Sequence, residues 1–267
     1  MDNRPIGVFD SGLGGLTVVR QLMRVLPQEQ IVYLGDTARV PYGSRSPEIV
    51  RKFARQDAYF LAGRNVKYIV IACNTASAQA EPDLVRRLAI PVMGVIEPGA
   101  TAAVAASRAG RIGVVGTLGT ITSGAYQRAI TMRRPQARII AQACPLFVPL
   151  VEEGAQESEA ASLIARDYLR PFRQDAVDSL ILGCTHYPIL QAVIARTVGP
   201  DVQLIDPGIA LAHALASELA ERGLEAEGAE AMQHQYYVTD RSVHFQELAE
   251  RFLGRSLCAT VEQVDLD

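Results

Sequence analysis

Several features that define other protein classes are missing from this chain of 267 residues. Its four cysteines lie far apart and form no CxxC pair, which argues against a zinc site or a thioredoxin-like motif. No apolar stretch has the length of a membrane span, and no basic segment followed by an apolar one suggests a signal peptide. A net charge of −3 gives no electrostatic attraction to nucleic acid or to an anionic membrane. We therefore predict a cytoplasmic protein with reduced thiols, no metal site, and no nucleic-acid or membrane partner.

Two apolar runs that end in a cysteine are the most informative segments present. Residues 68–75 read YIVIACNT, and residues 180–186 read LILGCTH. An aliphatic run that stops at a small residue is typical of a central strand in a parallel sheet, which is buried on both faces. Ligands of open α/β sheets bind at the carboxyl ends of such strands. Cys73 and Cys184 are therefore predicted to lie where the chemistry takes place.

The chain repeats this organisation once. Residues 6–15, IGVFDSGLGG, and residues 111–120, RIGVVGTLGT, each predict a strand, a glycine-rich turn and a helix start. Each copy is followed, at nearly the same distance, by one of the cysteine-bearing strands. Pro-Gly pairs at 98–99 and 207–208 predict turns near the ends of the two halves.

We predict an α/β fold of two pseudo-symmetric lobes with mainly parallel sheets, and an active site in the cleft between them. The first lobe spans residues 1–97, the second spans 98–206, and residues 207–267 form a C-terminal segment that returns to the first lobe. This segment is predicted to contain helices at 210–222 and 243–253. Lobes packed face to face would bring both cysteines to one cleft, which is a preferred place for a small ligand.

Matched thiols can face opposite sides of one carbon atom, and that arrangement suits a racemase. A free cysteine is often only a packing residue, and Cys144 and Cys258, which lack the repeated context, are interpreted in that way. His186 follows Cys184 closely enough to act as its proton partner.

Helix N-termini are expected beside both thiols. Thr75 and Ser77 are predicted to cap one helix and Thr185 another, so that free N–H groups point into the cleft. Such N–H groups hold anions and favour thiolates. The glycine-rich segment at 10–15 has neither the lysine of a P-loop nor the spacing of a dinucleotide fingerprint, and no motif suggests a cofactor. The polar loop at 35–43 is expected to carry function.

Six motifs make the chain resemble the glutamate racemases, within the cofactor-independent aspartate/glutamate racemase superfamily. They are FDSGLGG at 9–15, LGDTARVPYG at 34–43, ACNTAS at 72–77, GTLGT at 116–120, PLVEEG at 149–154 and GCTHYP at 183–188. The resemblance implies that the protein interconverts L- and D-glutamate without a cofactor. It also implies that the product supplies bacterial peptidoglycan synthesis, and with it cell-wall biogenesis and cell shape.

The resemblance implies a role for individual residues. Cys73 and Cys184 are the proton donors and acceptors, Cys73 serving the D-isomer and Cys184 the L-isomer. Three groups assist these transfers: Asp10, Glu152 and His186. Glu153 adjoins Glu152 and stays an alternative to it. The substrate contacts are Asp10, Ser11, Tyr42, Gly43, Asn74, Thr75, Thr117, Thr120, Thr185 and His186.

Other functions stay open at this point. An aspartate racemase, or another racemase that needs no cofactor, would use the same pair of thiols. A non-catalytic amino-acid sensor could also have two lobes around a cleft, but it needs no matched thiols. A cysteine hydrolase needs one nucleophile and leaves the second thiol unexplained. A homodimer is compatible with the sequence, which does not itself give the oligomeric state.

Overall fold

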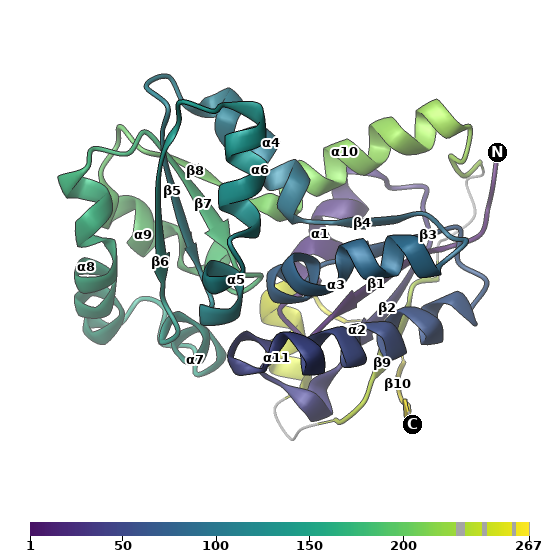
Figure 1. Cartoon of the computed structure of the whole chain (residues 1–267). Helices are drawn as coiled ribbons and strands as arrows, with labels where there is room; N and C mark the ends of the chain where they lie inside the picture. Colours follow the sequence, from purple (N-terminus) through teal and green to yellow (C-terminus); the bar gives the residue numbers. More distant parts are fainter. Residues whose placement is uncertain (228–232, 242–244, 258–259, 267) are drawn as a thin grey trace.

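The computed structural model describes residues 1–227, 233–241, 245–257 and 260–266. Cys258 and the first two residues of the helix expected at 243–253 lie outside these ranges. The described chain contains two parallel β-sheets with helices around them (Figure 1). This confirms the predicted fold class.

The first sheet has six strands in the order β10-β9-β2-β1-β3-β4, and every neighbouring pair is parallel. Its strands are β1 (Ile6–Asp10), β2 (Ile31–Gly35), β3 (Tyr68–Ile71), β4 (Val92–Gly94), β9 (Gln235–Val238) and β10 (Val261–Gln263). The last two strands come from the C-terminal segment, which therefore returns to the first sheet. They add to the free edge of β2.

The second sheet has four parallel strands in the order β6-β5-β7-β8. They are β5 (Arg111–Gly116), β6 (Arg138–Ala143), β7 (Ser179–Gly183) and β8 (Gln203–Ile205). β7 lies beside β5 just as β3 lies beside β1, so both cysteine-bearing strands occupy the same place in their sheets. The repeat in the sequence corresponds to this repeated sheet order.

The helices cover both sheets. They are α1 (Leu16–Val25), α2 (Pro47–Ala62), α3 (Asn74–Arg87), α4 (Ile96–Ala106), α5 (Leu118–Ser123), α6 (Ala125–Arg133), α7 (Phe147–Glu152), α8 (Glu159–Gln174), α9 (Gln191–Val198), α10 (Pro207–Arg222) and α11 (Phe245–Leu253). Short 3₁₀ helices are η1 (Thr37–Arg39), η2 (Tyr42–Ser44) and η3 (Tyr187–Leu190). In the described part of the chain, no helix is both long and apolar enough to cross a membrane.

The predicted turns at the Pro-Gly pairs are wrong, because both pairs lie in helix starts. Pro98 is in the first turn of α4, and Pro207 is the first residue of α10. A proline fits there because the N–H that it lacks has no partner within the helix. Asp206 caps α10 by accepting a hydrogen bond from the N–H of Gly208, 2.8 Å away.

The strands of the first sheet are buried on both faces, as their continuous apolar sequences require. Phe9 and Ile71 pack under α2 and α3, whereas Val8 and Val70 pack on the opposite face with α1 and α10. The apolar cluster that contains Val8 and Val70 continues into the second sheet, where it includes Leu180. One hydrophobic core therefore joins the two halves.

A buried ion pair fixes the corner where the C-terminal segment leaves α10. Lys67 Nζ lies 2.6 Å from Glu29 Oε2 and donates to the carbonyl oxygens of Asp2 and Leu224, each 2.6 Å away. Glu29 Oε1 accepts from the N–H of Ala226 at 2.9 Å. The Lys67 ammonium group thus links the N-terminal segment, at Asp2, to the C-terminal segment, at Leu224.

Lys67→Ala is expected to lower the free energy of unfolding by about 3–5 kcal/mol, because Glu29 would stay buried without its partner. Urea unfolding followed by circular dichroism measures this. Arg51→Ala removes an ion pair on the exposed face of α2 and should change the same quantity by less than about 1 kcal/mol. Equal effects of the two substitutions would contradict the role assigned to Lys67.

Candidate active site

A cavity of about 230 Å³ lies between the two sheets. Pockets for drug-sized ligands have about 300–1,000 Å³, so this one suits a smaller molecule. Among the residues that line it are eleven predicted site residues: Ser11, Tyr42, Gly43, Cys73, Asn74, Thr75, Thr117, Glu152, Cys184, Thr185 and His186. The structure therefore brings both thiols to one cavity.

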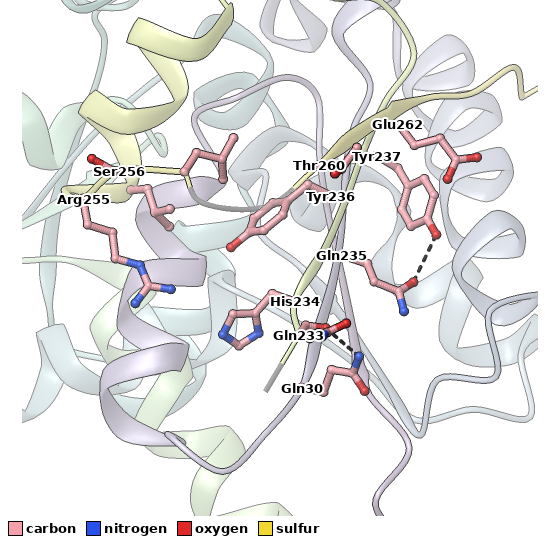
Figure 2. Close-up of a pocket in the computed structure, with 12 residues that line it drawn as sticks. Gln30, Gln233, His234, Gln235, Tyr236, Tyr237, Arg255, Ser256, Thr260 and Glu262 are labelled. Carbon is pink, nitrogen blue, oxygen red and sulfur yellow. Dashed lines mark hydrogen bonds between the residues drawn. The ribbon is translucent and has the colours of Figure 1, made fainter. Parts of the chain in front are cut away.

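A larger depression, about 820 Å³, lies at the β9 and β10 edge of the first sheet. Figure 2 shows that His234, Arg255 and Tyr236 extend toward one another there. None of its described lining residues is a cysteine or a predicted site residue. The smaller cavity is therefore the candidate active site.

Cys73 lies at the junction of β3 and α3, where it is the N-cap residue of the helix. Its Sγ accepts from the N–H of Ala76 at 3.5 Å and donates to Ser11 Oγ at 3.6 Å. The sequence prediction of a helix start beside Cys73 is confirmed. The predicted caps Thr75 and Ser77 are wrong, because the sulfur itself takes the capping position.

The surroundings of Cys73 favour its neutral form. Burial raises the pKa of Cys73 to about 12, and the charge of Asp10 adds to the shift. Burial also raises the pKa of Asp10, although the positive charge of His186 and backbone N–H groups oppose this. Asp10 is fully buried behind the cavity wall, and its Oδ2 accepts from the N–H of Gly12 at 3.0 Å.

Cys184 follows β7 and faces a chain of polar groups. Its Sγ lies 3.9 Å from His186 Nδ1, and His186 Nε2 lies 3.0 Å from Glu152 Oε1. Glu153, the alternative that the sequence left open, is exposed and does not line the cavity. The predicted helix cap at Thr185 is wrong, because the chain forms the short η3 there instead.

The polar chain gives Cys184 a cationic neighbour. Burial lowers the pKa of His186, but its hydrogen bonds to Cys184 and Glu152 outweigh burial and raise the pKa to about 10. At neutral pH the imidazole is therefore protonated, which places a positive charge beside the Cys184 sulfur. The two thiols thus have unequal surroundings: Cys73 lies near a buried carboxyl group, and Cys184 lies near an imidazolium.

Three threonine hydroxyls form a closed ring where the halves of the chain meet. Thr75 Oγ1 lies 2.8 Å from Thr117 Oγ1 and 3.1 Å from Thr120 Oγ1, and the last two lie 3.0 Å apart. Thr75 and Thr117 line the cavity, whereas Thr120 lies behind them and is buried. Neither Thr120 nor Asp10 lines the cavity, so a direct contact of either residue with a ligand stays a prediction.

A buried network supports the loop that contains Tyr42 and Gly43. The Tyr42 hydroxyl contacts the Asp36 carboxylate and lies 2.9 Å from Asp57 Oδ2. Since the hydroxyl has one hydrogen, it cannot donate to both carboxyl groups. Burial and the charge of Asp36 raise the pKa of Asp57 well above its usual range. Arg39 pairs with Asp36 at 2.7 Å and with Asp57 at 3.1 Å.

No individual role was predicted for eight further residues that line the cavity, five of which lie in the predicted motifs at 9–15 and 34–43. They are Gly12, Leu13, Thr37, Val40, Pro41, Val148, Asp240 and Leu248. Asp240 and Leu248 belong to the C-terminal segment, whose position depends on the strand order rather than on a local motif. Phe252 of the same segment packs against the His186 ring, with centroids 4.9 Å apart.

The cavity contains little positive charge. Among its described lining residues none is lysine or arginine, so His186 is the cationic group there. The described residues also contain no group of three His, Cys, Asp or Glu side chains placed to hold a metal ion. Hydroxyls, an amide and backbone N–H groups are the donors available to a ligand.

Comparisons with known proteins agree with one another. A family model described as Asp/Glu/Hydantoin racemase matches residues 6–215. A Geobacter metallireducens protein named glutamate racemase is 49% identical over 264 residues, which cover 99% of this chain and 97% of that protein. The structure of glutamate racemase RacE1 from Bacillus anthracis has a TM-score of 0.95 at 39% identity, covering 100% of this chain and 99% of that one. Francisella tularensis glutamate racemase in complex with D-glutamate has a TM-score of 0.94 at 42% identity, with the same coverage.

Brief treatment with iodoacetamide at neutral pH is expected to alkylate Cys184 before Cys73, because only the first has a protonated imidazole beside it. His186→Asn should slow the labelling of Cys184 about tenfold and leave Cys73 slow. Mass spectrometry of the digested protein gives both rates, with the fully buried Cys144 as the unlabelled reference. Faster labelling of Cys73 in the unsubstituted protein would contradict this order.

Proposed function

The chain belongs to the Asp/Glu/Hydantoin racemase family and is an isomerase, and we propose that it interconverts L- and D-glutamate. The observation that carries the proposal is a pair of thiols that reach one small cavity from different sheets. The names of the full-length relatives, and the D-glutamate bound in one similar structure, support glutamate as the substrate.

Recognition of this substrate would rest on neutral donors. Ser11, Asn74, Thr75, Thr117 and Thr185 supply hydroxyl and amide groups to the cavity wall. Arg39, in the 35–43 loop, pairs with the buried carboxyl groups of Asp36 and Asp57 and does not line the cavity. A ligand carboxylate would exchange its water for these donors and for the N–H groups at the start of α3.

The proton balance of the reaction closes with the two sulfur atoms. One thiolate takes the α-proton, and the thiol on the opposite face of the carbanion donates its own proton. The stereocentre is inverted, and the protonation states of the two sulfurs are exchanged. In a dry site, aimed N–H dipoles and hydroxyls stabilise the negative charge between the two steps, without a cofactor.

The unequal surroundings of the thiols indicate which one acts first. We infer that in the free protein Cys184, which has the His186 imidazole 3.9 Å from its sulfur, acts as the base, and that Cys73, whose pKa is raised by burial, acts as the acid. With Cys184 facing the L-isomer, as the family resemblance implies, the free protein is ready for L-glutamate. His186, held by Glu152, then assists the transfer of the proton to and from the Cys184 sulfur. Asp10 assists the transfer at Cys73.

Further elements of the proposal concern context. We propose that the D-glutamate serves bacterial peptidoglycan synthesis in the cytoplasm, and a homodimer stays a prediction.

We also propose that the chain divides into its two lobes and its C-terminal segment at residues 97 and 206. This division is supported by α4 and α10, which begin at Ile96 and Pro207, where the chain passes from one sheet to the other.

An aspartate racemase is the nearest alternative, and parallel assays of both amino acids by circular dichroism separate the two. Exchange of the α-proton with deuterated water separates a racemase from a non-catalytic sensor, since binding alone exchanges nothing. Activity on aspartate without activity on glutamate would overturn the proposed substrate and leave the family unchanged.

Cys73→Ala and Cys184→Ala are each expected to reduce glutamate racemisation by at least about 10³-fold, because each removes one of two proton-transfer groups. Cys144→Ala is the matched control, since this buried thiol does not line the cavity. Circular dichroism follows both the reaction and the fold. Full turnover by either cavity variant would end the two-thiol mechanism.

Glu152→Gln is expected to lower kcat by about 10²-fold, because His186 would lose the carboxylate that stabilises its charge. Glu153→Gln changes the same chemical group on the adjacent, exposed residue and should leave kcat within about twofold of the original. Initial rates in both directions measure the effect. Equal losses in the two variants would show that the hydrogen bond to His186 is not what matters.

A further inference from the structure

One buried tyrosine contacts the neighbours of both cysteines. Tyr126 lies on α6, beside α4 (Figure 1), and only 1% of it is exposed. Its hydroxyl donates to Asn74 Oδ1 at 2.6 Å, and Asn74 directly follows Cys73. Its ring packs on Gly183, which directly precedes Cys184: a Cβ on that glycine would lie 3.1 Å from Tyr126 Cε2.

The hydrogen bond decides which end of the Asn74 amide faces the cavity. A side-chain amide has an oxygen that accepts and a nitrogen that donates. Because Oδ1 is held by the Tyr126 hydroxyl, Nδ2 is the end left for a ligand, and Asn74 is one of the residues that line the cavity. The opposite orientation would present oxygen lone pairs to a ligand carboxylate and repel it.

The ring of Tyr126 acts as a spacer. It fills the volume between the end of β7 and α4, where a Cβ on Gly99 would lie 3.3 Å from Tyr126 Cε1. Its hydroxyl then reaches across to the first turn of α3. One rigid side chain thus spans from the strand end that carries Cys184 to the helix start that follows Cys73.

We propose that Tyr126 is a positioning residue of the active site, which aims Asn74 Nδ2 at a substrate carboxylate and fixes the spacing of the two cysteine-bearing segments. The inference rests on the proposed function for its substrate. A tyrosine that only filled the core would contribute to stability through its ring, and its hydroxyl would have no effect on substrate affinity.

Tyr126→Phe tests the hydroxyl alone. It is expected to raise the KM for glutamate about tenfold, with kcat changed less than about threefold, because an oriented donor to a charged group is lost. Tyr68→Phe is the matched control: Tyr68 is equally buried, and it lies at the end of β3 remote from Cys73. That variant should retain both constants. An unchanged KM in Tyr126→Phe would overturn the inference.

A double-mutant cycle tests whether Tyr126 acts through Asn74. Asn74→Ala should raise KM by itself, and adding Tyr126→Phe to it should raise KM no further. Additive effects would contradict the proposed route. If Tyr126→Phe fails to fold, Asn74→Asp replaces the donor and keeps the acceptor for Tyr126. It should then raise KM more than Asn74→Ala, and a KM like that of the unsubstituted protein would overturn the orientation assigned to Asn74.

Calorimetry of glutamate binding separates this inference from the proposed function. If the unsubstituted protein binds glutamate without racemising it, the proposed function fails, and the Tyr126 variants still report on orientation through the Kd. If racemisation is observed but Tyr126→Phe alters neither Kd nor KM, only the role of Tyr126 fails. Absence of both binding and turnover would overturn both proposals.

Discussion

Hydrogen bonds that cross between the halves of the chain hold the carboxyl ends of both sheets toward one cavity. Thr17 Oγ1 donates to the carbonyl oxygen of Thr185 at 3.0 Å. The hydroxyl of Thr75, on α3, bonds to that of Thr117, which follows β5 of the second sheet. Close backbone approach accompanies them, since a Cβ on Gly14 would lie 2.4 Å from Thr185 Oγ1. Neither half alone contains both of the thiols that line the cavity, so the candidate site depends on this interface.

The repeated halves place two thiols alike but surround them differently. The first sulfur caps a helix beside a buried carboxyl group, whereas the second faces an imidazole and a carboxylate. Symmetry of the backbone brings both sulfur atoms to one cavity. Asymmetry of the side chains gives the two sulfur atoms different charged neighbours.

Local patterns predicted most of the fold and of the cavity wall. Aliphatic runs located β3 and β7, and the polar residues after them line the cavity because strand ends of a parallel sheet meet at one edge. The η3 turn after Cys184 was not predicted, since Thr185 is as compatible with a helix cap as with a turn. Asp240 and Leu248 could not be predicted either, because strand order alone brings them to the site. Tyr126 carries no motif, and its role depends on a contact between distant segments.

The order of the strands also determines when the first sheet can be completed during synthesis. β2 becomes available near the beginning of translation, yet its partner β9 leaves the ribosome only after the whole second sheet. Until then β2 presents an unpaired edge, which in other proteins attracts foreign strands. A nascent chain of this topology therefore keeps the edge of β2 unpaired until residues 235–238 emerge, and a chain that ended before them would leave that edge open.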